Sequence, residues 1–341
     1  MPVRRASGRL TAAVVVAALL GACSSNPVDA PPPTIEPARA AVSPRPTVAP
    51  AGEVLPLAGR PQSALYDAAT AALVAFTPAA GPQAPATLTV FGRAGAPRTV
   101  TLPAPVSAVT GDGAGTVFAA TRGGVLSVDL ASGAATRTPV AGQTDTDFTA
   151  IARRADGRLV LGSAAGAAFT LTPDLAVARE ADIFARVDAL VTQGDVAVVL
   201  DRGQTSITAL NADGAPQQAL RAGLGATTLA ADPAGRVLVT DTRGGQLMVF
   251  SVDPLIQRQA YPVGGAPFGV VGASDLVWVS QTATNTVIGY DLSTGTPVEK
   301  MRYPTVQQPD SLAYDNATGT LYVVSGAGAG VQVIRDAAGP Q

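Results

Sequence analysis

The residues best placed to do chemistry are arginines that stand beside glycines at three points in the chain. These motifs are Thr121–Gly124, Asp201–Gly203 and Thr242–Gly245, and their arginines are Arg122, Arg202 and Arg243. A guanidinium group can offer a pair of N–H donors to a carboxylate or phosphate, and a neighbouring glycine lets the backbone approach as well. The recurrence therefore predicts a surface that binds an anionic ligand or an acidic partner.

The same motifs allow a purely structural interpretation. Asp201 and Asp241 stand next to two of them, so the arginines could pair with these carboxylates and tie adjacent repeats together. Both interpretations stay open from the sequence. The candidate contact residues are Arg122, Arg186, Asp201, Arg202, Asp241 and Arg243.

Several other kinds of site lack support in the sequence. Histidine is absent, which removes the most frequent general acid or base and the most frequent metal ligand. No nucleophile elbow, P-loop or dinucleotide fingerprint occurs, and we expect no cofactor. The formal net charge of −2 shows no basic excess, so nucleic acid is not an expected partner.

The first 22 residues have the pattern of an export leader. Arg4, Arg5 and Arg9 precede the apolar stretch Leu10–Leu20, which is short for a membrane span. The stretch ends in Leu20–Cys23, which resembles the bacterial lipobox; the alternative is an ordinary secretory leader. Cys23 is the only cysteine, so we predict that it carries a lipid anchor and holds the protein on the outer side of the cytoplasmic membrane.

Residues 23–52 are rich in proline and alanine. Eight prolines lie in this stretch: Pro27, Pro31, Pro32, Pro33, Pro37, Pro44, Pro46 and Pro50. Such a composition cannot bury a core, which predicts a largely disordered tether between the lipid and the domain.

Residues 53–341 repeat one unit of about 40 residues. Thr227–Pro267 contains four short apolar runs separated by turn residues, as in four antiparallel strands. Seven second-strand runs recur along the chain, each spaced about 40 residues from the next. They are Leu73–Phe76, Thr116–Ala120, Arg158–Gly162, Val196–Leu200, Arg236–Thr240, Leu276–Ser280 and Thr320–Val324.

Seven such units predict an all-β fold, a seven-bladed β-propeller of four-stranded antiparallel blades. The last unit has only three strands, and Glu53–Leu57 looks like a missing outer strand. Its pairing with Val331–Ile334 would close the ring and remove the free edge. The single tryptophan, Trp278, lies in an apolar run and is expected in the core.

The turns carry a family resemblance. Asp129–Gly133 and Asp291–Gly295 follow the pattern D-L-x-x-G, and Asp232–Asp241 reads DPAGRVLVTD. Residues 53–339 thus resemble NHL- and YVTN-type seven-bladed propellers, and with the leader the chain resembles the propeller lipoproteins of actinobacteria. This architecture hosts enzymes, scaffolds and ligand binders alike.

The resemblance implies that function lies on the channel face, where loops lead from outer to inner strands. We expect a non-catalytic binding or scaffold module, acting as a monomer on a protein, an envelope polymer or a small anionic ligand. The alternative is a metal-dependent, lactonase-like hydrolase that uses channel carboxylates. Against it, the lactonase-type propellers rely on glutamate or histidine, and the only glutamates here are Glu36, Glu53, Glu180 and Glu299.

Overall fold

The computed structural model describes Met1 and residues 33–81, 85–93 and 95–339. The chain divides into two compact units, Met1–Pro32 and Pro33–Gln341, and the description below concerns the second. The predicted lipidation site, Cys23, lies outside the described residues. Within the described part of the chain, no helix has the length and apolar character needed to cross a membrane.

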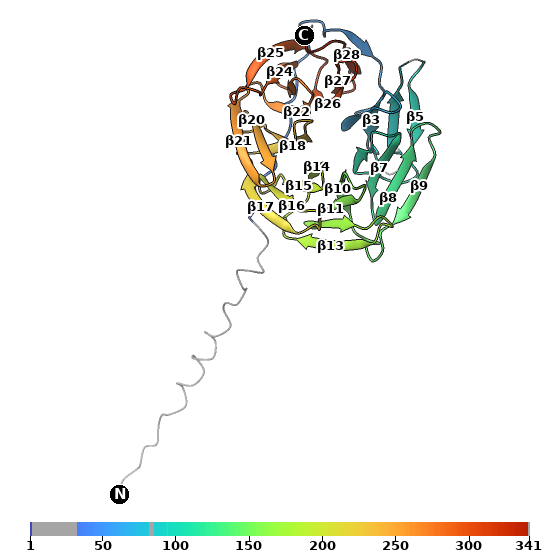
Figure 1. Ribbon diagram of the computed structural model, residues 1–341, viewed down its shortest axis with the longest axis vertical. Coiled ribbons are helices and arrows are strands. Elements are labelled where there is room, and N and C mark those ends of the chain that lie inside the picture. Colours follow the sequence, from blue (N-terminus) through green and yellow to red (C-terminus); the bar gives the residue numbers. More distant parts are fainter. Residues whose placement is uncertain (2–32, 82–84, 94, 340–341) are drawn as a thin grey trace. The chain divides into compact units, whose positions relative to one another are not determined.

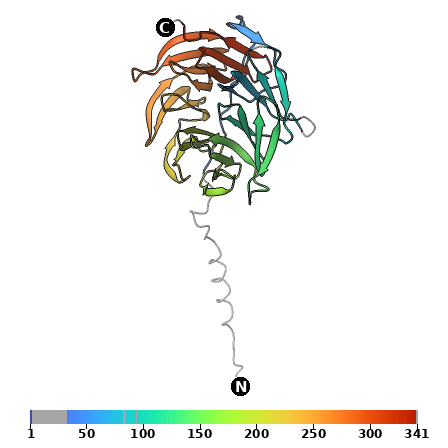
Figure 2. The same ribbon diagram turned by 45° about the vertical axis from the view of Figure 1, so that its right-hand side comes forward.

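Seven four-stranded antiparallel sheets stand around a central channel (Figures 1 and 2), which confirms the predicted propeller. Each sheet is a blade, and we number the blades in chain order from blade 1 (β2–β5) to blade 7 (β26–β28 with β1). The innermost strands are β2 (Ser63–Asp67), β6 (Ala108–Gly111), β10 (Phe148–Arg153), β14 (Ala189–Gln193), β18 (Ala226–Ala231), β22 (Pro267–Gly272) and β26 (Pro309–Asp315).

The other three strands follow outward in chain order in blades 1 to 6, and in blade 7 the order outward is β27, β28 and then β1. The second strands are β3 (Ala72–Thr77), β7 (Thr116–Thr121), β11 (Leu159–Ser163), β15 (Val196–Asp201), β19 (Val237–Asp241), β23 (Val277–Gln281) and β27 (Thr320–Ser325). The third strands are β4 (Thr87–Phe91), β8 (Gly124–Asp129), β12 (Ala167–Leu171), β16 (Ser206–Leu210), β20 (Gln246–Val252), β24 (Thr286–Asp291) and β28 (Val331–Ile334). The outer strands are β5 (Arg98–Thr101), β9 (Ala135–Pro139), β13 (Val177–Asp182), β17 (Pro216–Arg221), β21 (Leu255–Pro262), β25 (Val298–Pro304) and β1 (Glu53–Leu55).

The ring closes as predicted. Strand β1 pairs antiparallel with β28, with Glu53 opposite Val333 and Leu55 opposite Val331. The buried side-chain amide of Gln332 in β28 donates to the carbonyls of Ala51, at 2.8 Å, and Pro304, at 3.0 Å. The closing strand is thus tied to blade 6 as well as to blade 7, and it supplies the outer strand that blade 7 lacks.

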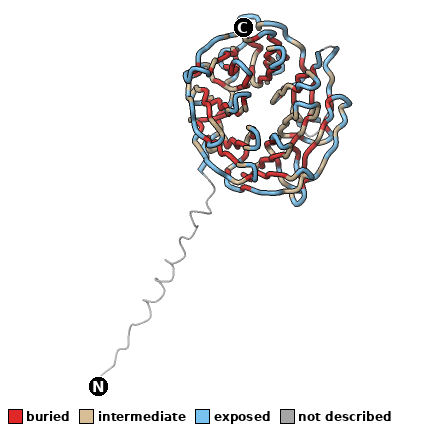
Figure 3. The backbone as a smooth tube through the Cα atoms, in the orientation of Figure 1, coloured by how far each residue is buried: buried red, intermediate tan, exposed pale blue. Residues whose placement is uncertain are grey.

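The core lies between neighbouring blades, because the flat faces of the sheets pack against one another. Figure 3 shows buried residues in the middle of the ring, many intermediate residues toward the channel, and exposed residues mainly along the periphery. Trp278 is fully buried, and its ring stacks on Tyr303 and Tyr314, with centroids 6.0 and 6.5 Å apart. The prediction that Trp278 is a core residue is confirmed, and it bridges blades 6 and 7.

The aspartate–glycine turns do the structural work expected of them. The carboxylate of Asp112 accepts the N–H groups of Ala114 at 2.8 Å and Thr116 at 2.9 Å. Gly115, in the same turn, has a φ of +100°, which a side chain would strain. Asp232 closes the equivalent turn of blade 5 by accepting from Arg236 N at 2.9 Å.

Residues 33–52 differ from the predicted disordered tether. We call residues 33–46 the strap, because they cross the loops of blades 4 to 7 on the channel face. Ile35 N donates to Gly203 O at 2.8 Å, and at the other end Asn285 Nδ2 donates to Pro44 O at 2.8 Å. Only Ala38 and Ser43 of the strap are buried. This segment is ordered without a hydrophobic core of its own, because hydrogen bonds to the strap backbone hold it.

Candidate functional site

The central channel is a cavity of about 620 Å³ bounded by the inner strands of all seven blades. Its wall is built mostly of small and aliphatic side chains, and hydroxyl groups gather where the inner strands begin. Among the described residues, three charged side chains also line it: Asp188, Arg202 and Asp310. These three form the candidate site, which we call the channel mouth.

The hydroxyl groups at this end bind neighbouring blades to one another. Ser107 Oγ of blade 2 donates to Phe148 O of blade 3, and Thr149 Oγ1 of blade 3 donates to Val187 O at 2.5 Å. Thr240 Oγ1 of blade 5 likewise donates to Phe268 O of blade 6 at 2.7 Å. Since these protons are already donated to carbonyls, the hydroxyls act as braces of the ring.

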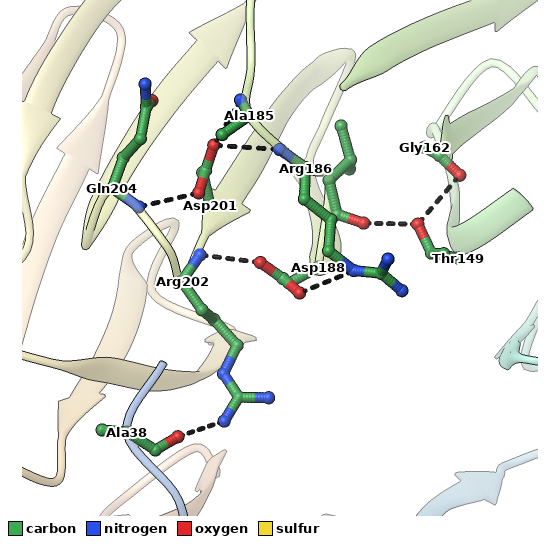
Figure 4. A network of polar contacts seen from close by, with 10 residues as sticks. Ala38, Thr149, Gly162, Ala185, Arg186, Asp188, Asp201, Arg202 and Gln204 are labelled. Atoms are coloured by element: carbon green, nitrogen blue, oxygen red, sulfur yellow. Dashed lines mark hydrogen bonds and ion pairs between the residues drawn. The ribbon is translucent and has the colours of Figure 1, made fainter. Parts of the chain in front are cut away.

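Asp188 stands immediately before β14, at the position where blades 2 and 3 carry Ser107 and Thr149. Its carboxylate accepts from Arg202 N at 2.8 Å and from Arg186 Nε at 3.1 Å (Figure 4). Burial raises the pKa of Asp188 above its usual value, and the two donors only partly offset that effect.

Arg202 follows β15 and lies between Asp188 and the strap. One terminal nitrogen, Nη2, donates to Ala38 O of the strap (Figure 4), and Nε is buried without a hydrogen-bond partner. Burial lowers the pKa of this guanidinium from its usual value, although it stays charged at neutral pH. A buried N–H without an acceptor costs roughly 1–3 kcal/mol, so the site favours anything that supplies one.

Asp310 lies on the blade 7 side of the mouth, and burial raises its pKa as well. The side-chain amide of Gln308 donates from Nε2 to the Asp310 carboxylate at 2.8 Å. The same amide group also binds the strap backbone. Its Nε2 donates to Ala41 O at 3.0 Å, and its Oε1 accepts from Ser43 N at 2.9 Å. Asp310 and the strap are therefore joined through one side chain.

Asp201 and Asp241 prove to be the last residues of β15 and β19, and both are buried, at 1% and 0% exposure. Asp201 accepts from Ala185 N and Gln204 N at 2.8 Å and from Arg186 N at 3.2 Å (Figure 4). Asp241 accepts from Gln246 Nε2 and from the N–H groups of Leu224, Gly225 and Gly244, all at 2.8 Å. Their oxygens hold loops in place, so the structural interpretation fits them, with backbone donors replacing the expected arginines.

The four candidate arginines do not lie together in one site. Arg122 is exposed, and its Nη1 donates to Asp145 O at 3.0 Å. Arg243 is also exposed and donates to Leu224 O at 3.2 Å and to Glu36 O of the strap at 2.6 Å. Arg186 pairs with Asp188. Of the four, only Arg202 thus lies in the channel mouth; Arg186 contacts the mouth through Asp188, and Arg122 and Arg243 lie away from it.

Sequence reasoning gave Asp188 no role in the site and overlooked the strap altogether. One signal could have found Asp188: a carboxylate replaces a hydroxyl at a repeated position. The strap offers little signal, because its contacts use its own backbone. The propeller side chains that hold it between Ala41 and Pro44 are Thr282, Asn285, Gln307 and Gln308.

Metal binding has no obvious location among the residues that the structure describes. In that part of the chain no three His, Cys, Asp or Glu side chains come together as a possible metal site. What the channel mouth offers instead is one desolvated guanidinium, Arg202, beside the carboxylate of Asp188, with a second carboxylate, Asp310, on blade 7; the pKa of both carboxylates is raised. Such a site can bind an acceptor group through hydrogen bonds and charge.

No protein-family model matches this chain, and no curated protein matches it. Solved structures do: a streptogramin B lyase has a TM-score of 0.68 at 12% identity, covering 83% of this chain and 97% of its own. A chain of a mitotic checkpoint complex has a TM-score of 0.69 at 12% identity, covering 87% and 98%. Virginiamycin B lyase from Staphylococcus aureus has a TM-score of 0.65 at 12% identity, covering 80% and 95%.

These similarities establish the seven-bladed propeller fold and go no further at such low identity. As many as 1339 solved chains match, and among them are lyases and an assembly component. The fold therefore does not select an activity, and the function has to be argued from the site.

Proposed function

We propose that this protein is a membrane-anchored, extracytoplasmic binding module without catalytic activity, whose channel mouth takes a small anionic ligand. The observation that carries the proposal is Arg202, whose Nε is buried without a partner at the mouth of a cavity of about 620 Å³. A carboxylate or phosphate oxygen would satisfy this donor.

The neighbouring carboxylates are compatible with an anion. The raised pKa values of Asp188 and Asp310 reflect the cost of burying their charge, so an approaching anion can be accommodated by proton uptake at either group. A protonated carboxyl would then donate a hydrogen bond to the ligand. The anchor at Cys23 is part of the same proposal and rests on the leader sequence.

Thermal unfolding in the presence of anions tests the ligand class. With inorganic phosphate and citrate as probes, a ligand at one hundred times its Kd adds about 2.7 kcal/mol of stability. For a domain of this size we expect a rise in Tm of about 5 °C. Arg202→Lys keeps the charge but lacks Nε, and it should lose most of the rise.

Arg122→Lys is the matched control, because Arg122 lies in the same kind of loop but away from the mouth; its shift should equal that of the parent protein. Equal shifts in both variants, or none with any anion, would remove the small-ligand proposal. A protein or envelope-polymer partner, found by crosslinking from the channel face, would then be the remaining form of a binding module.

The hydrolase alternative is tested by metal analysis of the purified protein. Stoichiometric Ca²⁺ or Zn²⁺ that disappears in Asp188→Asn or Asp310→Asn would favour the hydrolase over the binding module.

A further inference from the structure

The rim of blades 4 and 5 on the channel face combines exposed apolar and cationic side chains. Ile35 and Leu224 are 42% and 57% exposed, which is high for large aliphatic residues. Arg39, Arg221 and Arg243 are exposed around them. We call these five residues the rim patch. Arginine combined with exposed Ile or Leu is the composition of surfaces that rest on lipid.

Direct contacts hold the patch together. The strap positions Ile35 through its bond from Ile35 N to Gly203 O, and Arg243 joins Leu224 O to Glu36 O. Arg221 Nε donates to Gly223 O at 3.0 Å in the same loop as Leu224. Glu36 pairs with Arg39 at 3.2 Å, so three arginines and one glutamate leave the patch with an excess of positive charge.

The docked strap also shortens the connection to the proposed anchor. If residues 23–53 were all free, the domain could move about 105 Å from the lipid, at roughly 3.5 Å per residue. The described unit begins at Pro33, so only the stretch from Cys23 to Pro33 can span the gap, at most about 35 Å. The end of that short stretch lies two residues from Ile35, in the patch itself.

We propose that the rim patch lies on the anionic lipid surface of the membrane and that the channel face is turned toward it. This inference rests on the proposed anchor at Cys23 and adds the orientation and the contact surface. Each arginine is attracted to the anionic surface, and the apolar side chains enter the interface. The channel mouth is then reached most easily by ligands that are bound at the membrane.

The orientation can be measured on the lipidated protein in phosphatidylglycerol vesicles. Because lipid would occupy the thiol of Cys23, a cysteine introduced at Leu224→Cys would be the only thiol free to take an environment-sensitive fluorophore. Ala234→Cys is the matched control, since Ala234 is exposed in the turn after the inner strand of the same blade, at the opposite end. Brominated lipid should quench the label at position 224 at least threefold more than the label at 234. Equal or reversed quenching would overturn the proposal.

A second measurement does not depend on the anchor. The unit Pro33–Gln341 contains all the described strands and their core, so a chain starting at residue 24 keeps the fold. Arg39→Gln with Arg221→Gln should weaken its binding to phosphatidylglycerol vesicles about 30-fold, at roughly 1 kcal/mol each. Arg179→Gln with Arg258→Gln, on outer strands, removes the same charge elsewhere and should change binding less than twofold.

The two proposals can fail separately. A mass spectrum without lipid on Cys23 would remove the anchor, while charge-dependent vesicle binding would still support the patch. Lipid on Cys23, together with equal vesicle binding by both double variants of the chain that starts at residue 24, would overturn the patch and keep the anchor; a membrane protein would then be the remaining partner for the rim.

Discussion

The channel face has two halves that use the same sequence motif differently. In blades 4 to 7, Arg202 and Arg243 donate to backbone carbonyls of the strap, which crosses this half. In blade 2, Arg122 stands in the same Arg–Gly context but donates to its neighbour Asp145 O at 3.0 Å, and no strap residue is bonded to it among those described. The motif therefore specifies a loop geometry that presents an arginine outward. What the arginine binds depends on the chain that passes by.

The two halves also differ in how many hydrogen bonds the last residue of the second strand makes through its side chain. Thr121 in blade 2 makes one bond, from its hydroxyl to Pro105 O at 2.8 Å. Asp241 in blade 5 accepts four. Both residues form hydrogen bonds to the loop that comes from the preceding blade. A carboxylate can bind several groups of that loop at once, because it has about four acceptor positions. The blade 5 loop that contacts the strap is thus held by more side-chain hydrogen bonds at this position than its counterpart in blade 2.

Replacing the buried carboxylate should have the largest effect. Asp241→Ala leaves three loop N–H groups and one amide without an acceptor, and we expect a loss of about 3 kcal/mol in the free energy of unfolding. Thr121→Val breaks one bond and should cost about 1 kcal/mol. Urea unfolding of both variants measures the difference. Equal losses of unfolding free energy in the two variants would show that these side chains stabilise the two halves to the same extent.

Releasing the strap should have an intermediate effect. The Cβ of Ala38 lies 2.8 Å from where a Cβ on Gly225 would stand, so Ala38→Leu cannot be seated and should cost about 2 kcal/mol. Hydrogen exchange at the amides of Ile35, Ala41 and Ser43 should rise towards that of a free chain, while the blades stay protected. Val42→Leu is the control, because Val42 is 91% exposed and the change should leave exchange unaltered. Protection that survives Ala38→Leu would mean that the strap is held elsewhere.

The smallest effect is a pH dependence at the mouth. Because the pKa of Asp310 is higher in the folded protein than its usual 3.8, its stabilising contribution is complete below about pH 3.8 and is lost as the pH rises through the folded pKa. Asp310→Asn should therefore be more stable than the parent at pH 7, by less than about 1 kcal/mol after solvent screening. The gain should vanish near pH 4. The free energy of unfolding of both proteins, measured at each pH between 4 and 7, checks this. A difference between them that stays constant across the range would contradict the prediction.

Much of the fold could be predicted, because the repeat is defined by residue types that lie close together in the chain. Alternating apolar residues and turns such as Asp112–Gly115 recur at a fixed spacing, and each strand pairs with its neighbour in the chain. Even the long-range pairing of Glu53–Leu55 with Val331–Ile334 was predictable. The last blade lacks an outer strand, and the segment before the first blade has the sequence of one. The second strands run one residue further than predicted, which moved Asp201 and Asp241 from loop to strand.

The site was less predictable, for a reason visible in Arg202. The sequence identifies an arginine beside a glycine, but its neighbour Asp188 comes from the loop before another strand, and Ala38 comes from a segment 164 residues away. Which N–H is left without an acceptor depends on the packing of all three. The composition of residues 33–46 predicted disorder, since it has almost nothing to bury, and backbone hydrogen bonds carry no signature in side-chain type.

The sequence by itself determined the blades: their number, their strands, their turns and the way that the ring closes. These follow from periodicity and turn chemistry, which act between residues close together in the chain. Only the tertiary structure decided that Asp201 and Asp241 are braces, that Asp188, Arg202 and Asp310 share the channel mouth, and that the strap covers one half of the face. Those results depend on burial and on which donors meet which acceptors, and both are set when distant parts of the chain come together.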